Sequence, residues 1–475
     1  MSKYQEYYKL QEKKDIEMYA YDCPDIGKWK IDDVEFDCGE DFRTVERYKE
    51  YKDAGFTILF SAFTAKYIGQ EWETSELKMV MDRAYEAGLK KVIILDDRIM
   101  EKSRIAGGII GEGKPFATEE DLENFIRDCF KDYTKHPAFY GLKLQDEPRH
   151  QYFKAIGQIF KAVRKVRPET FLQCNLVPIL CLHCTNGMYP EGGDMYDRYK
   201  AYLCEFLDES QADYVLCDSY PFQEPEQMLF GVFSGIGRHF IRTLQICAEV
   251  CKERNVNFYF VAQSTGIHNK GQVSLRVPTK EEVYWQANLL LGFGLRELAY
   301  FTYWTRTQSY TKGEFFKDGC AMISLRGEQT PLYHAIKEVN TMIHALAPVI
   351  TQFKYVADRY LISTPFRSHP FFLEYTLRKE LKTLEFAETD REVAMVNELY
   401  DEKRDQWMYM IMNATDPLYN EYMIMPQKTT IRFKKKYQKV DIFEEGKWRT
   451  ETLENNTFTV KLNAGHAYFI LPYNE

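Results

Sequence analysis

One strand-like segment of the sequence ends in two adjacent carboxylic acids. Residues 139–148 read Phe-Tyr-Gly-Leu-Lys-Leu-Gln-Asp-Glu-Pro, so that an alternating apolar run stops at Asp146 and Glu147. Pro148 lacks a backbone N–H for the next ladder hydrogen bond, and we expect the strand to end before it. A carboxylic acid held at a strand end, half out of water, can transfer a proton to a leaving group. The same residues could instead form an acidic loop that caps the next helix.

The other strands decide where these acids would lie. Apolar strand-like runs alternate with helix-period segments from residue 15 to residue 346, a pattern typical of βα units and a parallel sheet. The expected strands are 15–21, 56–60, 91–95, 139–145, 170–176, 213–217, 257–262 and 297–303. The expected helices are 44–54, 73–87, 118–133, 152–166, 194–207, 240–254, 279–293 and 331–346, with Pro348 ending the last. Eight such strands close a barrel, so the predicted fold class is α/β with a (β/α)8 TIM barrel.

The sequence changes character after Pro348. The segments 407–413, 429–433, 439–443, 457–462 and 466–471 are short strand-like runs separated by turn residues. Short strands without helices predict a small antiparallel β-sandwich. Residues 380–405 are charged and irregular, and we interpret them as an excursion or long hairpin of this second domain. The predicted domains are therefore a barrel over 1–348 and a C-terminal β-sandwich over 349–475.

Polar residues follow most of the predicted strands. In a (β/α)8 barrel the chemistry lies at the carboxyl ends of the strands. If the strand count is right, these residues converge around Glu147: Asp22, Asp96, Asp97, Asp146, Asn175, Asp218, Tyr220, Gln263 and Trp304. Several carboxylates, two amides, a tyrosine and a tryptophan at one end are more than loop composition predicts. Arg98 and Arg306 lie just beyond strand ends and could bind an acidic sugar or pair with the local carboxylates.

Several short motifs resemble those of a known group of enzymes. The chain is similar to the large clan of (β/α)8 glycoside hydrolases that includes β-galactosidases and cellulases. The resemblance rests on Asp-Glu-Pro at 146–148, Asp-Ser-Tyr-Pro at 218–221, Tyr-Phe-Thr-Tyr-Trp at 300–304 and the segment 319–333. It covers nearly the whole chain, since a C-terminal β domain is common in the same group, but each motif is short.

The resemblance implies roles for individual residues. Glu147 matches the acid/base glutamate that follows the fourth strand in that clan. Tyr220 matches a tyrosine that supports the nucleophile. Trp304 matches a tryptophan that forms the floor of the sugar subsite. Retaining members place a second glutamate after the seventh strand, where this chain has Gln263. An amide cannot serve as an anionic nucleophile.

Three interpretations follow from Gln263. In the first, which we favour, another carboxylate is the partner of Glu147. Asp218 is the leading candidate, followed by Asp96, Asp97 or Asp22. Carboxyls about 5–5.5 Å apart would predict retention and about 6.5–9.5 Å inversion. In the second, the substrate supplies its own nucleophile and Gln263 orients it. In the third, the barrel has lost hydrolysis and binds sugar or transforms it by other chemistry.

The predicted function is hydrolysis of a glycosidic bond in a small oligosaccharide or glycoside. Glu147 is the expected general acid/base, its pKa raised by partial burial and by Asp146, with Asp218 as the second catalytic residue. The expected substrate-binding residues are Asp22, Asp96, Asp97, Asp146, Asn175, Tyr220, Gln263 and Trp304. Hydrolysis needs no metal or organic cofactor. The alternatives are a non-catalytic carbohydrate-binding barrel, and a sugar lyase or isomerase whose metal is held by Asp96, Asp97, Glu147 or Asp218.

Composition narrows the partners and the compartment. The net charge is −9 and no basic run is interleaved with aromatics, which argues against nucleic acid. No signal peptide is visible at the start, and no apolar run approaches the ~20 residues of a membrane helix. Eleven cysteines fit a reducing cytoplasm, and the single Cys181-x-x-Cys184 pair lacks the further ligands of a zinc site. We therefore expect a cytoplasmic protein that binds carbohydrate. The expected partners also include further copies of the chain in a homo-oligomer, because such β domains often join subunits.

Overall fold

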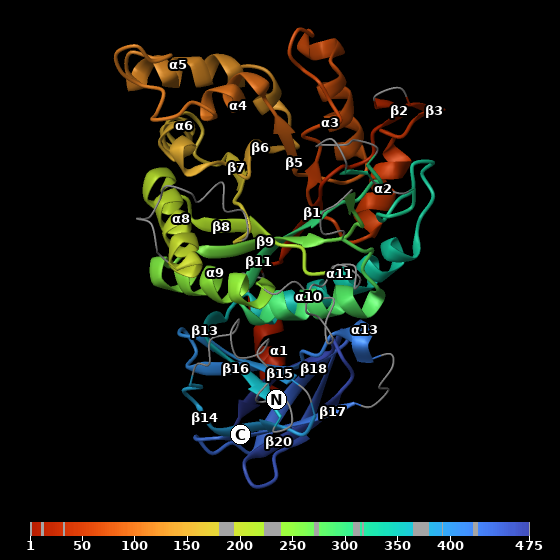
Figure 1. The fold of residues 1–475 in the computed structure, drawn as a ribbon, viewed down its shortest axis with the longest axis vertical. Helices are drawn as coiled ribbons and strands as arrows, with labels where there is room; N and C mark the ends of the chain where they lie inside the picture. The colour runs from red at the N-terminus through yellow and green to blue at the C-terminus, as the bar shows by residue number, and fades with distance from the viewer. Residues whose placement is uncertain are drawn as a thin grey trace.

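The structure is a computed structural model. It describes residues 2–10, 14–31, 34–179, 194–222, 239–269, 275–306, 314–315, 318–363, 380–391, 393–420 and 426–474. Figure 1 shows the alternating helices and strands at one end of the molecule and a domain of β-strands at the other, beneath α9 (Phe240–Arg254), α10 (Lys280–Gly292) and α11 (Pro331–Ile350).

Eight parallel strands form the framework of the larger part. One four-stranded sheet has the order β4-β5-β6-β7, and the other has the order β1-β11-β9-β8. All neighbouring pairs are parallel. The strands are β1 (Glu17–Ala20), β4 (Leu59–Phe60), β5 (Val92–Leu95), β6 (Phe139–Asp146), β7 (Phe171–Asn175), β8 (Tyr214–Asp218), β9 (Asn257–Gln263) and β11 (Leu295–Phe301). The predicted α/β fold with parallel strands is confirmed.

Backbone hydrogen bonds join the two sheets at both seams. Ile58 N–H, just before β4, donates to the Met18 carbonyl of β1 at 3.1 Å. Leu176 N–H, just after β7, donates to the Leu216 carbonyl of β8 at 2.8 Å. The order of the strands and these two seams fit a (β/α)8 barrel.

Helices follow the strands as their apolar periodicity predicts, except for the short helix Asp97–Ser103, which was not predicted. They are α2 (Val45–Asp53), α3 (Glu76–Glu86), α4 (Asp97–Ser103), α5 (Glu119–Phe130), α6 (Phe153–Val166) and α8 (Met195–Ser210), besides α9, α10 and α11. Capping boxes begin α5 at Thr118 and α10 at Thr279, where side chain and backbone satisfy each other's first-turn donors. Among the described residues, no helix combines the length and apolarity needed to cross a membrane.

The end of α11 differs from the prediction. Pro348 was expected to stop this helix, yet α11 continues to Ile350. A proline this close to the end removes only one helical hydrogen bond. Ala347, Val349 and Ile350 are fully buried, and their packing offsets that loss. The first strand of the second domain begins at Lys354.

The C-terminal part consists of two antiparallel sheets. One has the order β13-β15-β16-β21-β18-β19 and the other β14-β17-β20. Side chains from both sheets share one hydrophobic cluster, which includes Val396, Ile411, Ile431 and Ile470. The strands are β13 (Lys354–Ile362), β14 (Leu384–Thr389), β15 (Val393–Asp401), β16 (Gln406–Asn413), β17 (Gln427–Phe433), β18 (Lys439–Glu444), β19 (Lys447–Thr452), β20 (Thr457–Leu462) and β21 (Ala467–Tyr473).

The sequence pattern did not predict β13, β14, β15 or β19 as strands. The segment 380–405, interpreted as an excursion or long hairpin, contains β14 and β15, which belong to different sheets. Strand β15 lies inside the larger sheet although it carries Asn397 and Glu398, both fully buried. Asn397 donates to the Gly292 carbonyl at 3.1 Å, and Glu398 accepts from the backbone N–H groups of Lys382 and Thr383 at 2.8 Å each. The Asn397 amide nitrogen and the Glu398 carboxylate thus have backbone partners from other segments, so a strand that looks charged in the sequence can be interior.

Smaller elements decorate the two parts. The helix α1 (Lys3–Tyr8) contacts the β domain: Tyr4 stacks on Trp448 with ring centroids 4.9 Å apart, and the Tyr7 hydroxyl donates to Asp401 at 3.1 Å. The others are the hairpin β2 (Ile26–Ile31) and β3 (Val34–Asp41), the ribbon β10 (His268–Asn269) and β12 (Glu314–Phe315), and α13 (Pro417–Asn420).

A buried carboxyl lies near the amino end of β11. Glu297 is 3% exposed, and its Oε1 has no hydrogen-bond partner among the described residues. Burial, together with the carboxylates of Glu17 and Asp213, raises its pKa to about 8, against the opposing effect of Lys91. The folded protein therefore holds a proton that the unfolded chain releases near pH 4.5, and the free energy of unfolding falls as the pH rises from there to about 8.

Glu297→Gln removes this titration. We expect its melting temperature to exceed that of the wild type by several degrees at pH 8 and by much less near pH 5, just above the pH at which the unfolded chain begins to release the proton of Glu297. Thermal unfolding monitored by circular dichroism between pH 5 and 8 measures the difference. Glu120→Gln, at an exposed position on α5, is the control. Melting curves of Glu297→Gln and wild type that stay parallel over this range would contradict the assignment.

Candidate active site

Strand β6 delivers the two adjacent carboxylates to the carboxyl ends of the strands. The strand ends at Asp146, one residue beyond the predicted end, and Glu147 takes a left-handed backbone conformation with φ 48°. Its N–H donates to the Asn175 carbonyl at the end of β7, at 2.8 Å. A positive φ is uncommon for a residue other than glycine, and such conformations concentrate at functional sites. Both acidic side chains are exposed to solvent.

Asp146 is held in its ionised form. Its carboxylate lies 3.0 Å from Lys143 Nζ and accepts a hydrogen bond from Asn175 Nδ2 at 3.1 Å. Burial acts to raise the pKa of Asp146, but Lys143, Asn175 and Arg306 outweigh it and lower the pKa. The side chain remains 47% exposed, so this fixed negative charge is accessible from solvent.

Lys143 is the functional residue that the sequence analysis missed. Its side chain is only 2% exposed, and its ammonium lies 5.1 Å from the ring of Tyr21 and 4.4 Å from that of Phe63. The register against β7 shifts between Lys143 and Gln145, which lets residues three apart on β6 meet. The signal was a single lysine within an apolar strand, because a buried ammonium requires a partner.

Asp22 forms a second ion pair beside the first. It follows β1 with φ 54°, and its Oδ2 lies 2.7 Å from Arg306 Nε. Both side chains are largely buried, at 15% and 11% exposed. Burial raises the pKa of Asp22, against the opposing effects of Arg306 and Lys143. Of the two roles considered for Arg306, pairing with a local carboxylate is the one observed.

Asp218 faces the pair on β6 from the end of β8. It is 4% exposed, and its Oδ1 has no hydrogen-bond partner among the described residues. Burial and then the charges of Glu147 and Asp146 raise the pKa of Asp218 well above its usual range, while a hydrogen bond with Tyr220 lowers it. Asp218 therefore gives up its proton less readily than an ordinary aspartic acid does.

Tyr220 completes this side of the group. Its ring stacks on Phe301 with centroids 5.6 Å apart and an angle of 22° between the planes. Burial, Asp218, Glu147 and Asp146 raise the pKa of its hydroxyl well above the usual value, so it stays a hydrogen-bond donor. The structure thus brings together six of the predicted site residues: Asp22, Asp146, Glu147, Asn175, Asp218 and Tyr220.

Two predicted residues after β5 lie outside this group. Asp96 is 4% exposed and caps α4, where its carboxylate pairs with Arg98 at 2.7 Å and accepts from the Tyr133 hydroxyl at 2.9 Å. Asp97 is the exposed first residue of α4. These contacts account for both carboxylates as parts of a helix start.

Gln263 and Trp304 are enclosed by protein. The Gln263 side chain is fully buried: its Oε1 accepts from Phe222 N–H at 2.9 Å, and its Nε2 donates to the carbonyls of Phe222, Thr265 and Arg276. This amide ties together the loops after β8 and β9. Trp304 is 3% exposed and packs on Phe42, with ring centroids 4.7 Å apart. Neither presents a face to solvent.

Metal ligation was one of the alternatives for the acidic residues at the strand ends. Across the described ranges, no three His, Cys, Asp or Glu side chains form a group that could hold a metal ion. The Cys181-x-x-Cys184 pair lies outside the described residues.

Comparisons with known proteins support the fold. No family model and no curated sequence matches the chain. A solved family 5 glycoside hydrolase from Bacteroides vulgatus is similar to it with a TM-score of 0.50 and 8% identity, over 97% of this chain and 88% of that one. An α-amylase from Geobacillus thermoleovorans, solved with acarbose, gives 0.48 and 10% over 98% and 100%, and an Anoxybacillus α-amylase gives 0.46 and 11% over 91% and 90%. At 8% identity, the first similarity shows a shared fold alone.

Lys143→Met tests the electrostatics of this group. Removing the ammonium should raise the pKa of Asp146, because Lys143 is the strongest influence that lowers it. Asn175→Ala should raise the same pKa by less, since it removes one neutral hydrogen bond. A carbon-detected NMR titration of the Asp146 carboxyl gives the measurement. An unchanged pKa in Lys143→Met would show that the ion pair does not form.

Proposed function

We propose that the protein is an O-glycosyl hydrolase whose two parallel sheets close into one (β/α)8 barrel. Glu147 and Asp218 are its catalytic carboxyls. The observation that carries this proposal is buried Asp218, whose pKa is raised by burial and then by the charges of the exposed residues Glu147 and Asp146, while the pKa of Asp146 is lowered. Carboxyl groups whose environments push their pKa values apart are typical of acid and base assignments at active sites. The fold supports the class only by analogy.

Cleavage of a glycosidic bond requires a proton for the leaving oxygen and negative charge near the anomeric carbon. Asp218, whose pKa is raised, supplies the proton, and Glu147, the exposed carboxyl, relays it to the leaving oxygen as the C–O bond breaks. The positive charge that develops on the sugar ring favours ionisation of both carboxyls. Water then adds to the anomeric carbon and returns a proton to the two carboxyls.

The remaining members of the group set the charge around this step. Ionised Asp146, fixed by Lys143 and Asn175, stabilises the developing cation without being consumed. Asp22 and Arg306 flank it and are proposed to contact sugar hydroxyls. Tyr220 keeps Asp218 oriented through their hydrogen bond. Four predicted residues take no part in the proposed site: Asp96 and Asp97 belong to the start of α4, and Gln263 and Trp304 are enclosed by protein.

Glu147→Gln and Asp218→Asn test the catalytic assignment. Each should lower kcat/KM on aryl glycosides by about a hundredfold or more, because one removes the relay of the proton and the other its source. Asp128→Asn, an exposed position on α5 with a side chain 69% exposed, is the matched control and should keep wild-type activity. Full activity in Glu147→Gln would remove that residue from the mechanism.

The wild-type protein distinguishes the two alternative functions. If it binds sugars by calorimetry but cleaves none of a broad panel, the barrel is a binding protein. Loss of activity in a chelator would indicate a metal-dependent enzyme.

Tyr220→Phe tests the direction of the pKa shift. The hydrogen bond from Tyr220 lowers the pKa of Asp218, so its loss should raise that pKa further. Because the form with Asp218 protonated is the active one, the alkaline limb of the kcat/KM profile should move to higher pH. Profiles measured from pH 4 to 10 for both proteins decide this. If the alkaline limb stays at the same pH in Tyr220→Phe, Asp218 is not the group whose ionisation this limb reports.

A further inference from the structure

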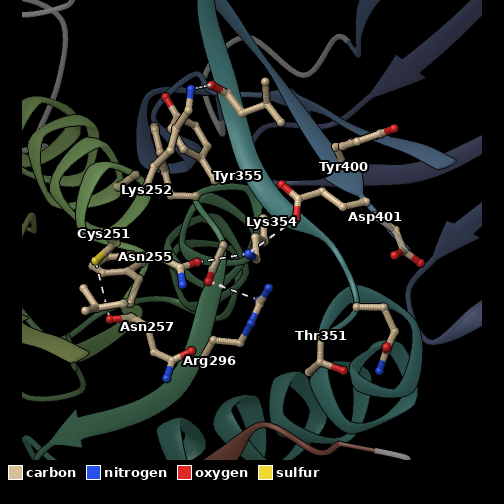
Figure 2. A pocket seen from close by; sticks show the side chains of 18 of the residues that line it. Cys251, Lys252, Asn255, Asn257, Arg296, Thr351, Lys354, Tyr355, Tyr400 and Asp401 are labelled. Atoms are coloured by element: carbon tan, nitrogen blue, oxygen red, sulfur yellow. Dashed lines mark hydrogen bonds and ion pairs between the residues drawn. The ribbon is translucent and has the colours of Figure 1, made fainter. Parts of the chain in front are cut away.

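A cavity lies at the amino ends of β9 and β11, away from the carboxylates of the candidate active site. It encloses about 440 Å3 between the parallel strands and the β domain. One wall comes from the end of α9 and the starts of β9 and β11, and the other comes from β13 and the end of β15. Figure 2 shows the side chains of Asn255, Arg296 and Lys354 around this space.

The lining of this cavity is basic in an acidic protein. The whole chain carries a net charge of −9. The carboxylates in the lining are Asp401 and Glu402, and Asp401 is engaged by Arg404 at 2.8 Å and by the Tyr7 hydroxyl at 3.1 Å. The cations are Lys14, Lys252, Arg296, Lys354 and Lys403. This local excess of positive charge favours an anionic occupant.

Arg296 supplies a cation without a carboxylate partner among the described residues. Its guanidinium donates to the carbonyls of Gly294 at 3.1 Å, Leu295 at 2.9 Å and Phe353. Burial lowers its pKa to about 10, which reflects the cost of dehydrating the charge. Carbonyl oxygens offset only part of that cost, whereas an anion would form charge-assisted hydrogen bonds with the remaining N–H groups.

Lys354 supplies a cation from the β domain. Its Nζ donates to Asn255 Oδ1 at 3.0 Å and lies 3.7 Å from the Glu402 carboxylate. The Lys354 side chain is 60% exposed and the Glu402 side chain 70% exposed, so their ion pair is weak and can be exchanged for a ligand. The two parts of the chain therefore each contribute a cation to one cavity.

We propose that this cavity binds a small organic phosphate, with the phosphate group between Arg296 and Lys354. Arginine with several lysines suits a dianion better than a single carboxylate. The cavity is larger than a phosphate ion needs, and Asn257, Thr351 and Gln352 line it with groups that can bond hydroxyls. Such a ligand contacts both parts of the molecule and stabilises their association.

Isothermal titration calorimetry and thermal unfolding of the full chain test the site, at constant ionic strength. The probes are glycerol 3-phosphate, inorganic phosphate and glycerol. We expect glycerol 3-phosphate to bind and to raise the melting temperature, inorganic phosphate to bind more weakly, and glycerol to have no effect. Absence of binding by both phosphates overturns the proposal, and binding of inorganic phosphate alone overturns its organic part.

Variants locate the binding. Arg296→Met and Lys354→Met should each weaken glycerol 3-phosphate binding by about tenfold or more, since each removes a charge-assisted contact. Lys354→Met keeps the result decisive if Arg296→Met fails to fold, because Lys354 is largely exposed. Lys161→Met, with a side chain 59% exposed and paired to Glu119 on another face, is the matched control and should bind as the wild type does. Equal affinity in the wild type and Lys354→Met would place the phosphate elsewhere.

Discussion

Repulsion among four carboxyl groups at the ends of β1, β6 and β8 is the constraint on which the site depends. Two largely buried cations make their coexistence possible: Lys143 pairs with Asp146, and Arg306 pairs with Asp22. Asp218 responds in the other way, because burial and the charges of Glu147 and Asp146 raise its pKa and favour its protonated form. The proposed chemistry follows from this division. The charge of Asp146 is fixed by Lys143, the charge of Asp22 is paired with Arg306, and the proton of Asp218 is the one that can move.

Much of the fold could be predicted because burial has a period. Parallel strands covered on both faces appear as apolar runs, and their helices repeat every 3.6 residues. The prediction failed where tertiary contacts replaced the local signal. The polar residues Asn397 and Glu398 made the segment of β15 look charged and irregular in the sequence. Both are buried in the fold, where their partners are the distant Gly292 carbonyl and backbone groups near Lys382. Pro348 was tolerated because the hydrophobic packing of its neighbours outweighed one lost hydrogen bond.

The sequence could predict at which end of the strands the candidate site lies, but not which way each side chain points. A residue that follows a strand lies near the right end of the sheet, which correctly brought Asp146, Asn175 and Asp218 together. The same rule cannot say whether a side chain turns toward its neighbours across the sheet or toward its own loop. Gln263 bonds to nearby backbone, and Asp96 caps the next helix. Lys143 escaped notice because an apolar strand was expected to carry only apolar residues on its buried positions.

The contacts of α1 have a consequence for the order in which the chain assembles. The Tyr4 N–H donates to Asp441 at 2.9 Å across 437 residues of sequence, and Figure 1 shows both chain ends in the β domain. During synthesis the first helix emerges long before its partners Asp401, Asp441 and Trp448. The parallel strands can therefore gather around their own core early, whereas the first helix docks only after the ribosome has released the last strands.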